Sequence, residues 1–141
     1  MSEKGWLLHP QLAIDAVLVG DLALSRVLAI NAADYPWLIL VPRRAGVSEI
    51  IDLGDDASTL MSEIAQTSRV LKALTKCDKL NVAAIGNVVP QLHVHIVARW
   101  KTDPLWPKPV WGAAPPRARE TAKFAGFVSA IREGLRIADR C

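Results

Sequence analysis

Cysteine, histidine and long apolar runs are all scarce in this chain of 141 residues. The two cysteines, Cys77 and Cys141, belong to no close cysteine pair or Cys-His cluster, so no disulfide framework is expected. The longest apolar runs, such as Trp37 to Val41, fall far short of the roughly 18 residues that cross a bilayer. The first residues lack a basic region followed by a long apolar stretch. We therefore expect a soluble cytoplasmic protein without a membrane partner.

Charge of one sign is not in large excess either. The net charge is +3 and the pI is near 9.1, with the basic residues spread along the chain. This small excess is compatible with a phosphate-bearing ligand but does not indicate nucleic-acid binding. No specific nucleic-acid partner is expected. Hydrophobic residues make up 51% of the chain, which suits one compact domain that buries about two-thirds of its unfolded surface.

The hydrophobic pattern predicts short strands interrupted by one long helix. Apolar runs bounded by turn residues predict strands at about residues 16–19, 26–30, 37–41, 80–85 and 91–98, with turns at Gly20-Asp21 and Gly86-Asn87. Helical spacing predicts a short helix near residues 10–16, a long one over about 56–76 and a C-terminal one through 124–135. Five prolines argue against regular structure in 102–116. This order predicts an α+β fold with a mainly antiparallel sheet.

The most informative segment is Gln91-Leu92-His93-Val94-His95-Ile96-Val97. In an extended strand, residues two apart point to the same face, so His93 and His95 are expected side by side while the alternate apolar residues face the core. Imidazole acts as a nucleophile, a general acid or a metal ligand near neutral pH. From spacing alone, two hydrogen-bonded histidines on a half-buried strand remain an equal alternative.

This segment resembles the signature of the histidine triad (HIT) family, in which three histidines alternate with hydrophobic residues. The resemblance extends over about residues 12–100, and Gln91 stands where the family has its first histidine. It implies an antiparallel sheet with helices on one side and a homodimer whose sheets join. We accordingly expect a single HIT-like domain over residues 1–141, with 101–141 as its C-terminal extension.

The resemblance also implies the catalytic roles. His93 occupies the position of the nucleophile, and His95 matches the histidine that contacts the phosphate and assists the leaving group. Gln91 matches the residue that orients the nucleophile, but an amide cannot act as a titrating acid or base. Trp37 stands where many members have a further histidine. The residues at positions 91 and 37 both raise the question whether the protein catalyses turnover.

Three further positions are candidates for substrate binding by the same resemblance. Gly86 and Asn87 match the pair that precedes the triad strand and offers donors to the phosphate, although Val88 replaces a hydroxyl residue found in some members. Asn31 matches a ribose-contacting position if a gap of two residues is allowed. Turn and loop roles are the alternatives for Asn87 and Asn31.

The leading hypothesis is a HIT-like nucleotide hydrolase or nucleotidyl transferase that acts at a nucleoside phosphate through a histidine nucleophile. The alternative, motivated by Gln91 and Trp37, is a nucleotide-binding regulatory module with weak or no catalysis. A metal site at His93 and His95 is a third possibility, but no further ligand occurs at recognisable spacing. Neither a cofactor nor a metal is expected; the expected partners are a nucleotide or nucleotide conjugate and a second copy of the chain.

Overall fold

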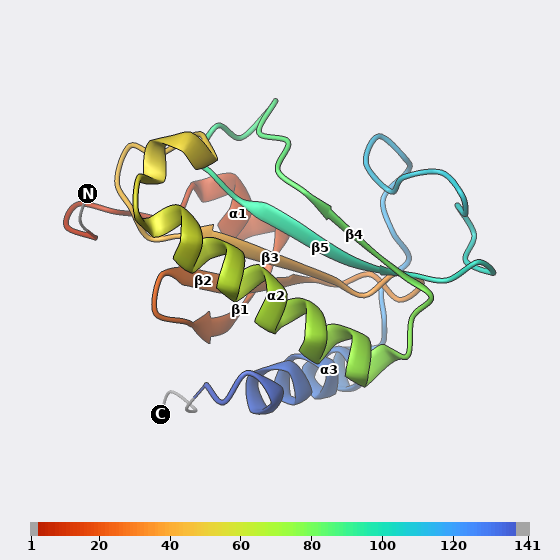
Figure 1. Cartoon of the computed structure of the whole chain (residues 1–141). Helices are drawn as coiled ribbons and strands as arrows, with labels where there is room; N and C mark the ends of the chain where they lie inside the picture. Colours follow the sequence, from red (N-terminus) through yellow and green to blue (C-terminus); the bar gives the residue numbers. More distant parts are fainter. Residues whose placement is uncertain (1–2, 138–141) are drawn as a thin grey trace.

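A five-stranded antiparallel sheet organises the chain in the computed structural model, which describes residues 3–137 (Figure 1). Its spatial order is β1-β2-β3-β5-β4, and every neighbouring pair is antiparallel. The strands are β1 (Val17–Asp21), β2 (Ser25–Ile30), β3 (Trp37–Pro42), β4 (Lys79–Ala83) and β5 (Val94–Arg99). The α+β prediction with a mainly antiparallel sheet is confirmed.

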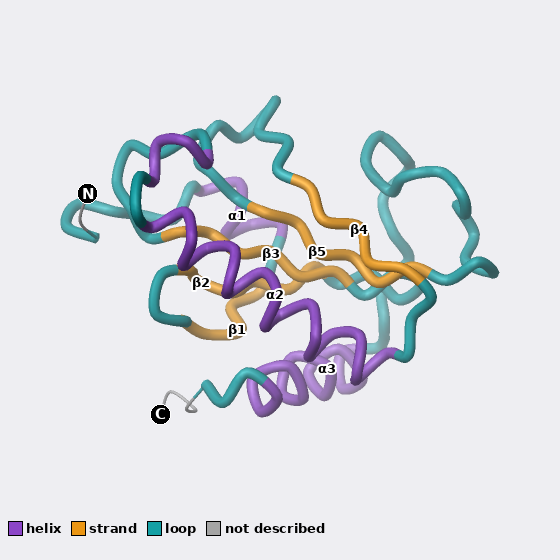
Figure 2. Tube along the Cα trace, in the orientation of Figure 1, coloured by secondary structure: helices purple, strands orange, loops and turns teal. Residues whose placement is uncertain are grey.

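Helices cover both faces of this sheet. The long helix α2 (Asp56–Thr75) packs on β5, and α3 (Thr121–Gly134) packs on α2 and β1 (Figure 2). A short helix, α1 (Pro10–Asp15), precedes β1, and one 3-10 turn, η1 (Ile50–Leu53), precedes α2. None of the helices within residues 3–137 is both long enough and apolar enough to cross a membrane.

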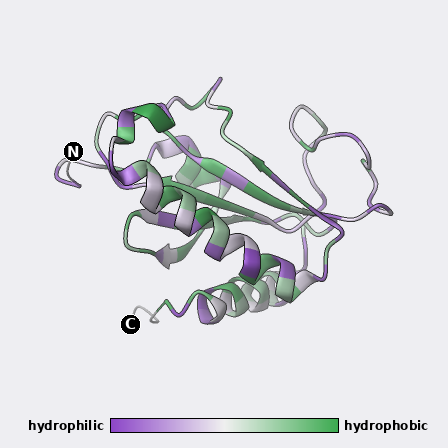
Figure 3. Ribbon diagram, in the orientation of Figure 1, coloured by the Kyte–Doolittle hydropathy of each residue, from purple (hydrophilic) through white to green (hydrophobic). Residues whose placement is uncertain are grey.

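Alternation along the strands divides the buried side chains into two clusters. One cluster lies between the sheet and helices α2 and α3, and it contains Leu38, Leu40, Val94 and Ile96 from the central strands. The other lies on the opposite face with Leu12 of α1 and alternate strand residues that include Ile39 and Val97. Figure 3 shows the hydrophobic colour along the central strands and a mixed pattern along α2. Because both faces are covered, β3 and β5 are buried along their whole length.

Two local predictions require correction. Gly20 and Asp21 belong to β1 instead of a turn, and the register shifts beside Gly20. Glycine is needed there because a Cβ would collide with the side chain of Ile137. The strand predicted for 91–98 begins only at Val94, since β4 ends at Ala83 and the Leu92 amide instead donates to the carbonyl of Val47.

A buried carboxylate joins the long helix to the sheet. Glu63 of α2 is 5% exposed and accepts hydrogen bonds from the backbone amides of Leu24 and Ser25, at 2.8 and 3.0 Å. Leu24 lies in the connection between β1 and β2, Ser25 is the first residue of β2, and both residues are buried. Glu63 therefore fixes the position of this connection against α2.

Glu63→Ala is expected to lower the free energy of unfolding by about 2–4 kcal/mol, because it leaves two buried amides without an acceptor. Urea denaturation followed by circular dichroism measures the change. The matched control is Glu133→Ala, an exposed helical carboxylate whose loss should change stability by less than about 0.5 kcal/mol. Equal stability of the two variants would contradict the role of Glu63.

Candidate active site

His93 and His95 lie side by side on the sheet face that is turned away from α2 and α3. Their ring centroids are 5.0 Å apart, and the side chains are 6% and 8% exposed. Leu92, Val94 and Ile96 are buried in the cluster on the other face. The alternation predicted from the sequence is therefore observed, although His93 itself precedes the first residue of β5.

A hydrogen bond to the backbone determines which nitrogen of His93 is available for chemistry. Nδ1 of His93 lies 2.7 Å from the carbonyl oxygen of Gln91. A carbonyl oxygen can only accept, so Nδ1 carries the proton and, in the neutral ring, Nε2 has the free lone pair. The ring therefore presents the lone pair of Nε2, the atom through which a neutral imidazole can act as a nucleophile.

The side chain of Gln91 is occupied elsewhere. Its Oε1 accepts from the amide of His9 at 2.8 Å, and its Nε2 donates to the carbonyl of Leu7 at 2.8 Å. The amide group thus binds the segment that leads into α1. Residue 91 hydrogen-bonds to His93 through its backbone carbonyl, which every residue type provides.

His95 accepts a hydrogen bond from a tryptophan. The indole Nε1 of Trp37 donates to His95 Nδ1 at 3.0 Å, and the two rings meet edge to face. Burial, with a smaller contribution from the neighbouring His93, lowers the pKa of His95 from 6.5 to about 4. His95 is therefore a neutral imidazole at physiological pH.

A cavity of about 240 Å³ opens beside the two histidines. Most of its lining is apolar, and among residues 3–137 Asp15 is the only acidic side chain that contributes to it. The lining comes from α1, β2, β3, the β4–β5 connection and the proline-rich loop: Leu12, Asp15, Ile30, Ile39, Ile85, Gly86, Asn87, Val88, Val89, His93, His95 and Trp111. Such a cavity suits a ligand with one apolar, planar part and one polar centre.

The structure brings two of the three predicted binding residues to this cavity. Gly86 and Asn87 lie in its wall, and Gly86 has a φ of 68°, a left-handed conformation that favours glycine. Asn31 does not line the cavity. Its amide group pairs with the backbone of Arg119, accepting from N at 2.9 Å and donating to O at 3.3 Å. Asn31 thus attaches the segment before α3 to the end of β2.

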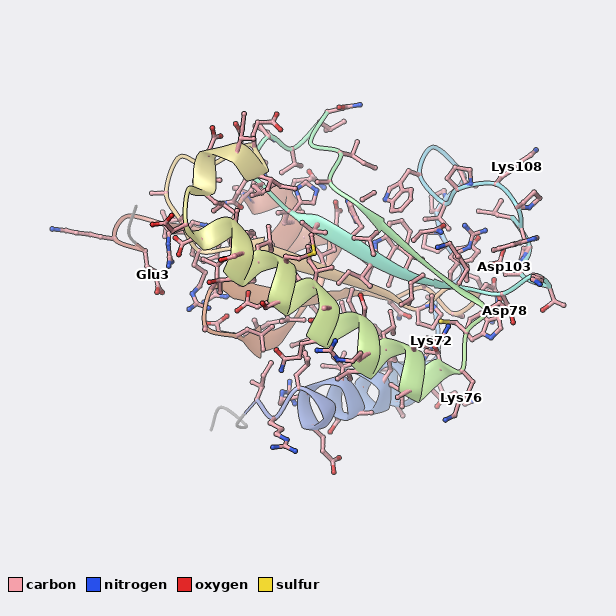
Figure 4. All side chains as sticks on the ribbon, viewed as in Figure 1. Glu3, Lys72, Lys76, Asp78, Asp103 and Lys108 are labelled. Carbon is pink, nitrogen blue, oxygen red and sulfur yellow. The ribbon has the colours of Figure 1, made fainter. Side chains whose placement is uncertain are left out.

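Trp111 and Asp15 belong to the cavity wall but were not expected there. Trp111 reaches His95 because a buried ion pair anchors the loop that carries it: Arg99 donates to both carboxylate oxygens of Asp103 at 2.8 and 3.1 Å. The Arg99 guanidinium also lies against the rings of Tyr35 and Trp106. Figure 4 shows Asp103 on this loop and Lys108 farther out along it. No sequence signal connects Trp111 to the histidines, because the contact depends on the path of an irregular loop.

The donor set around the histidines does not favour a metal ion. Among residues 3–137, no group of three or more His, Cys, Asp or Glu side chains is placed to hold one.

Comparisons with known proteins agree with this geometry. The HIT domain family matches residues 11–102. The solved structure of a histidine triad protein from Bradyrhizobium japonicum is 53% identical, has a TM-score of 0.88, and aligns over 92% of this chain and 98% of that chain. Another, from Sinorhizobium meliloti, is 36% identical with a TM-score of 0.89 and coverage of 94% and 99%. The chain belongs to the histidine triad (HIT) family.

Curated relatives match over a shorter stretch. Two Mycobacterium tuberculosis proteins named AP-4-A phosphorylase are 36% identical over 80 residues. The match covers 49% of this chain and 40% of each mycobacterial protein, so this chain spans less than half of their length.

Gln91→Ala distinguishes the role of the Gln91 side chain from that of its backbone carbonyl. We expect faster hydrogen exchange at the His9 amide and a loss of about 1–2 kcal/mol in stability, because the side chain no longer binds the segment before α1. The proton on His93 Nδ1 should stay in place, since the backbone carbonyl remains. Nitrogen-15 NMR of the histidine rings measures this directly, and a proton that moves to Nε2 would show that the Gln91 side chain controls the tautomer of His93.

Proposed function

We propose that this protein is a nucleotide hydrolase or nucleotidyl transferase that cleaves a bond next to a nucleoside phosphate, with His93 as the nucleophile. The observation that carries the proposal is the hydrogen bond from His93 Nδ1 to the Gln91 carbonyl, which leaves Nε2 free beside a cavity. A second imidazole lies next to it. The resemblance to the HIT signature supports the same roles for His93 and His95.

In the first step, His93 Nε2 attacks phosphorus and an N–P bond forms as the bond to the leaving group breaks. The leaving group departs with the bonding electron pair, and the ring becomes a phosphorylated imidazolium. The Gln91 carbonyl stabilises this positive charge because it accepts from the Nδ1–H. In the second step, water or another acceptor attacks phosphorus, and the N–P electrons return to Nε2. Water loses a proton and the product is a nucleoside monophosphate.

The cavity supports a nucleoside as the group attached to the phosphate. Ile30, Ile39 and Leu12 offer apolar contacts to a planar base, whereas Asn87 offers amide donors in the same cavity wall. Asp15 is a carboxylate acceptor in the same wall, and its Oδ1 receives a hydrogen bond from Gln11. Carboxylates of this kind suit ribose hydroxyl groups.

The name AP-4-A phosphorylase given to the mycobacterial relatives supports including dinucleoside polyphosphates among the substrates to be tested. Nucleoside phosphoramidates form the second substrate group, since the same nucleophile cleaves a P–N bond. A nucleotide-binding module with little turnover is the alternative function. It is favoured by Val88, an 88% exposed apolar residue in the cavity wall where some members have a hydroxyl.

His93→Ala is expected to reduce nucleotide release by at least about a thousandfold, because the other imidazole in the cavity wall, His95, already uses the lone pair of its Nδ1 to accept from Trp37. The assay uses adenosine and guanosine phosphoramidates and dinucleoside polyphosphates, with nucleotide release followed by chromatography. His9→Asn, which removes the one histidine outside the cavity and keeps a side-chain acceptor for the N-terminus of α1, is the matched control and should keep most of the turnover. Circular dichroism establishes that both variants are folded.

Turnover that persists in His93→Ala would contradict the nucleophile. Nucleotide binding in calorimetry without turnover by the wild-type protein would favour the regulatory module. Absence of both binding and turnover across the panel would contradict both functions.

We further propose that the protein forms a homodimer through the free edge of β4. The resemblance to HIT proteins supports this, and Val82 on this edge strand is 46% exposed. Light scattering at micromolar concentration should give the mass of two chains, and Val82→Lys should shift the population towards one chain because a charged edge opposes strand pairing. A monomeric wild-type protein would contradict the proposal.

A further inference from the structure

The hydrogen bond between Trp37 and His95 joins two residues that are both nearly buried. Trp37 is 8% exposed, and its indole N–H points at a nitrogen of the histidine that neighbours the nucleophile. The bond connects β3 to β5, whose backbones are adjacent in the sheet. Both side chains are therefore held by regular structure instead of by a loop.

We propose that Trp37 is a positioning residue that fixes His95 as the neutral imidazole protonated on Nε2. An indole nitrogen can only donate, so the Nδ1 that receives its hydrogen must carry a lone pair. In the opposite tautomer, and equally in the imidazolium, a proton on Nδ1 would face the indole proton. Trp37 thus disfavours both of those states without touching the substrate.

The other groups around His95 do not offset this effect. His93 is the nearest titratable side chain, and a positive charge on either ring opposes one on the other. Asp15 lies in the wall of the same cavity, but burial and His93 are the causes that determine the direction of the His95 pKa. The residues opposite His95 on β3 and β4 are Ile39 and Ala83, which carry no charge. Trp111 contributes an edge-to-face ring contact.

The consequence for chemistry rests on the proposed function. A neutral imidazole with one N–H donates a hydrogen bond, but it cannot give that proton away near neutral pH. His95 therefore stabilises charge on a phosphate oxygen or on the departing atom, and the leaving group's own acidity decides how readily it departs.

The direct test is nitrogen-15 NMR of the histidine rings in the full-length wild-type protein, titrated from pH 7.5 towards pH 4. We expect His95 to show a protonated Nε2 and an unprotonated Nδ1, with no titration down to about pH 5 because its pKa is lowered to about 4. A protonated Nδ1, or titration near the ordinary histidine pKa, overturns the proposal whether or not the protein turns over nucleotides.

Trp37→Phe tests whether the indole N–H is the cause. This variant keeps a ring against His95 but removes the donor, so we expect Nδ1–H to become populated and the His95 pKa to rise, while burial and His93 still keep it below the ordinary histidine value. Trp111→Phe is the matched control, because it changes the other indole that packs on His95 without removing a hydrogen bond to it. An unchanged tautomer and pKa in Trp37→Phe, or the same change in both variants, overturns the assignment.

Thermal denaturation establishes that both variants fold. If Trp37→Phe does not fold, site-specific replacement of Trp37 by 3-benzothienylalanine removes the N–H while keeping the shape of the side chain. The same tautomer measurement then applies, and it decides the proposal in the same way.

A kinetic measurement links the tautomer to turnover. Aryl esters of adenosine monophosphate with leaving groups of graded acidity should react with a steep dependence on that acidity in the wild type, and with a shallower one in Trp37→Phe below the raised His95 pKa. An unchanged dependence overturns the catalytic consequence. Absence of any turnover contradicts the proposed function, whereas the NMR result still decides the tautomer.

Discussion

The burial of Leu92, Val94 and Ile96 against the helices is the constraint on which the site depends. Because side chains alternate along extended backbone, these three residues force His93 and His95 to the opposite face. A slip of one residue would place both imidazoles in the hydrophobic core and expose the apolar residues. The free energy of core packing therefore maintains the register that the chemistry requires.

The His93 and His95 rings are oriented by a backbone carbonyl and by the indole of Trp37. In the HIT signature, a third histidine stands at the position of Gln91. The His93 ring is oriented by the backbone carbonyl of residue 91, so the glutamine at that position leaves this hydrogen bond intact. The glutamine side chain instead attaches the N-terminal segment, which brings α1 and the cavity residues Leu12 and Asp15 to the site. The glutamine at position 91 is a departure from the signature at a catalytic position, but in the structure its side chain holds the N-terminal segment in place.

The proline-rich loop completes the site from a different part of the chain. Arg99 at the end of β5 and Asp103 form a buried ion pair whose charges also meet polar and aromatic partners. Buried pairs of this kind tolerate the loss of one partner poorly, because the remaining charge is left in an apolar environment. Anchoring at this point gives the loop a defined path, and Trp111 reaches His95 as a result.

The amino-acid sequence by itself determined the strands, the long helix and the shared face of His93 and His95, because hydrophobic periodicity is a local property of the chain. Gly86 and Asn87 were expected beside the histidines from the resemblance to the HIT signature, and both lie in the cavity wall. The tertiary structure alone decided the rest: the partner of Trp37, the separation of Asn31 from the cavity, and the arrival of Trp111 and Asp15. Those contacts join residues that are distant in the chain, and which of them meet depends on how the sheet is ordered and how its loops are anchored.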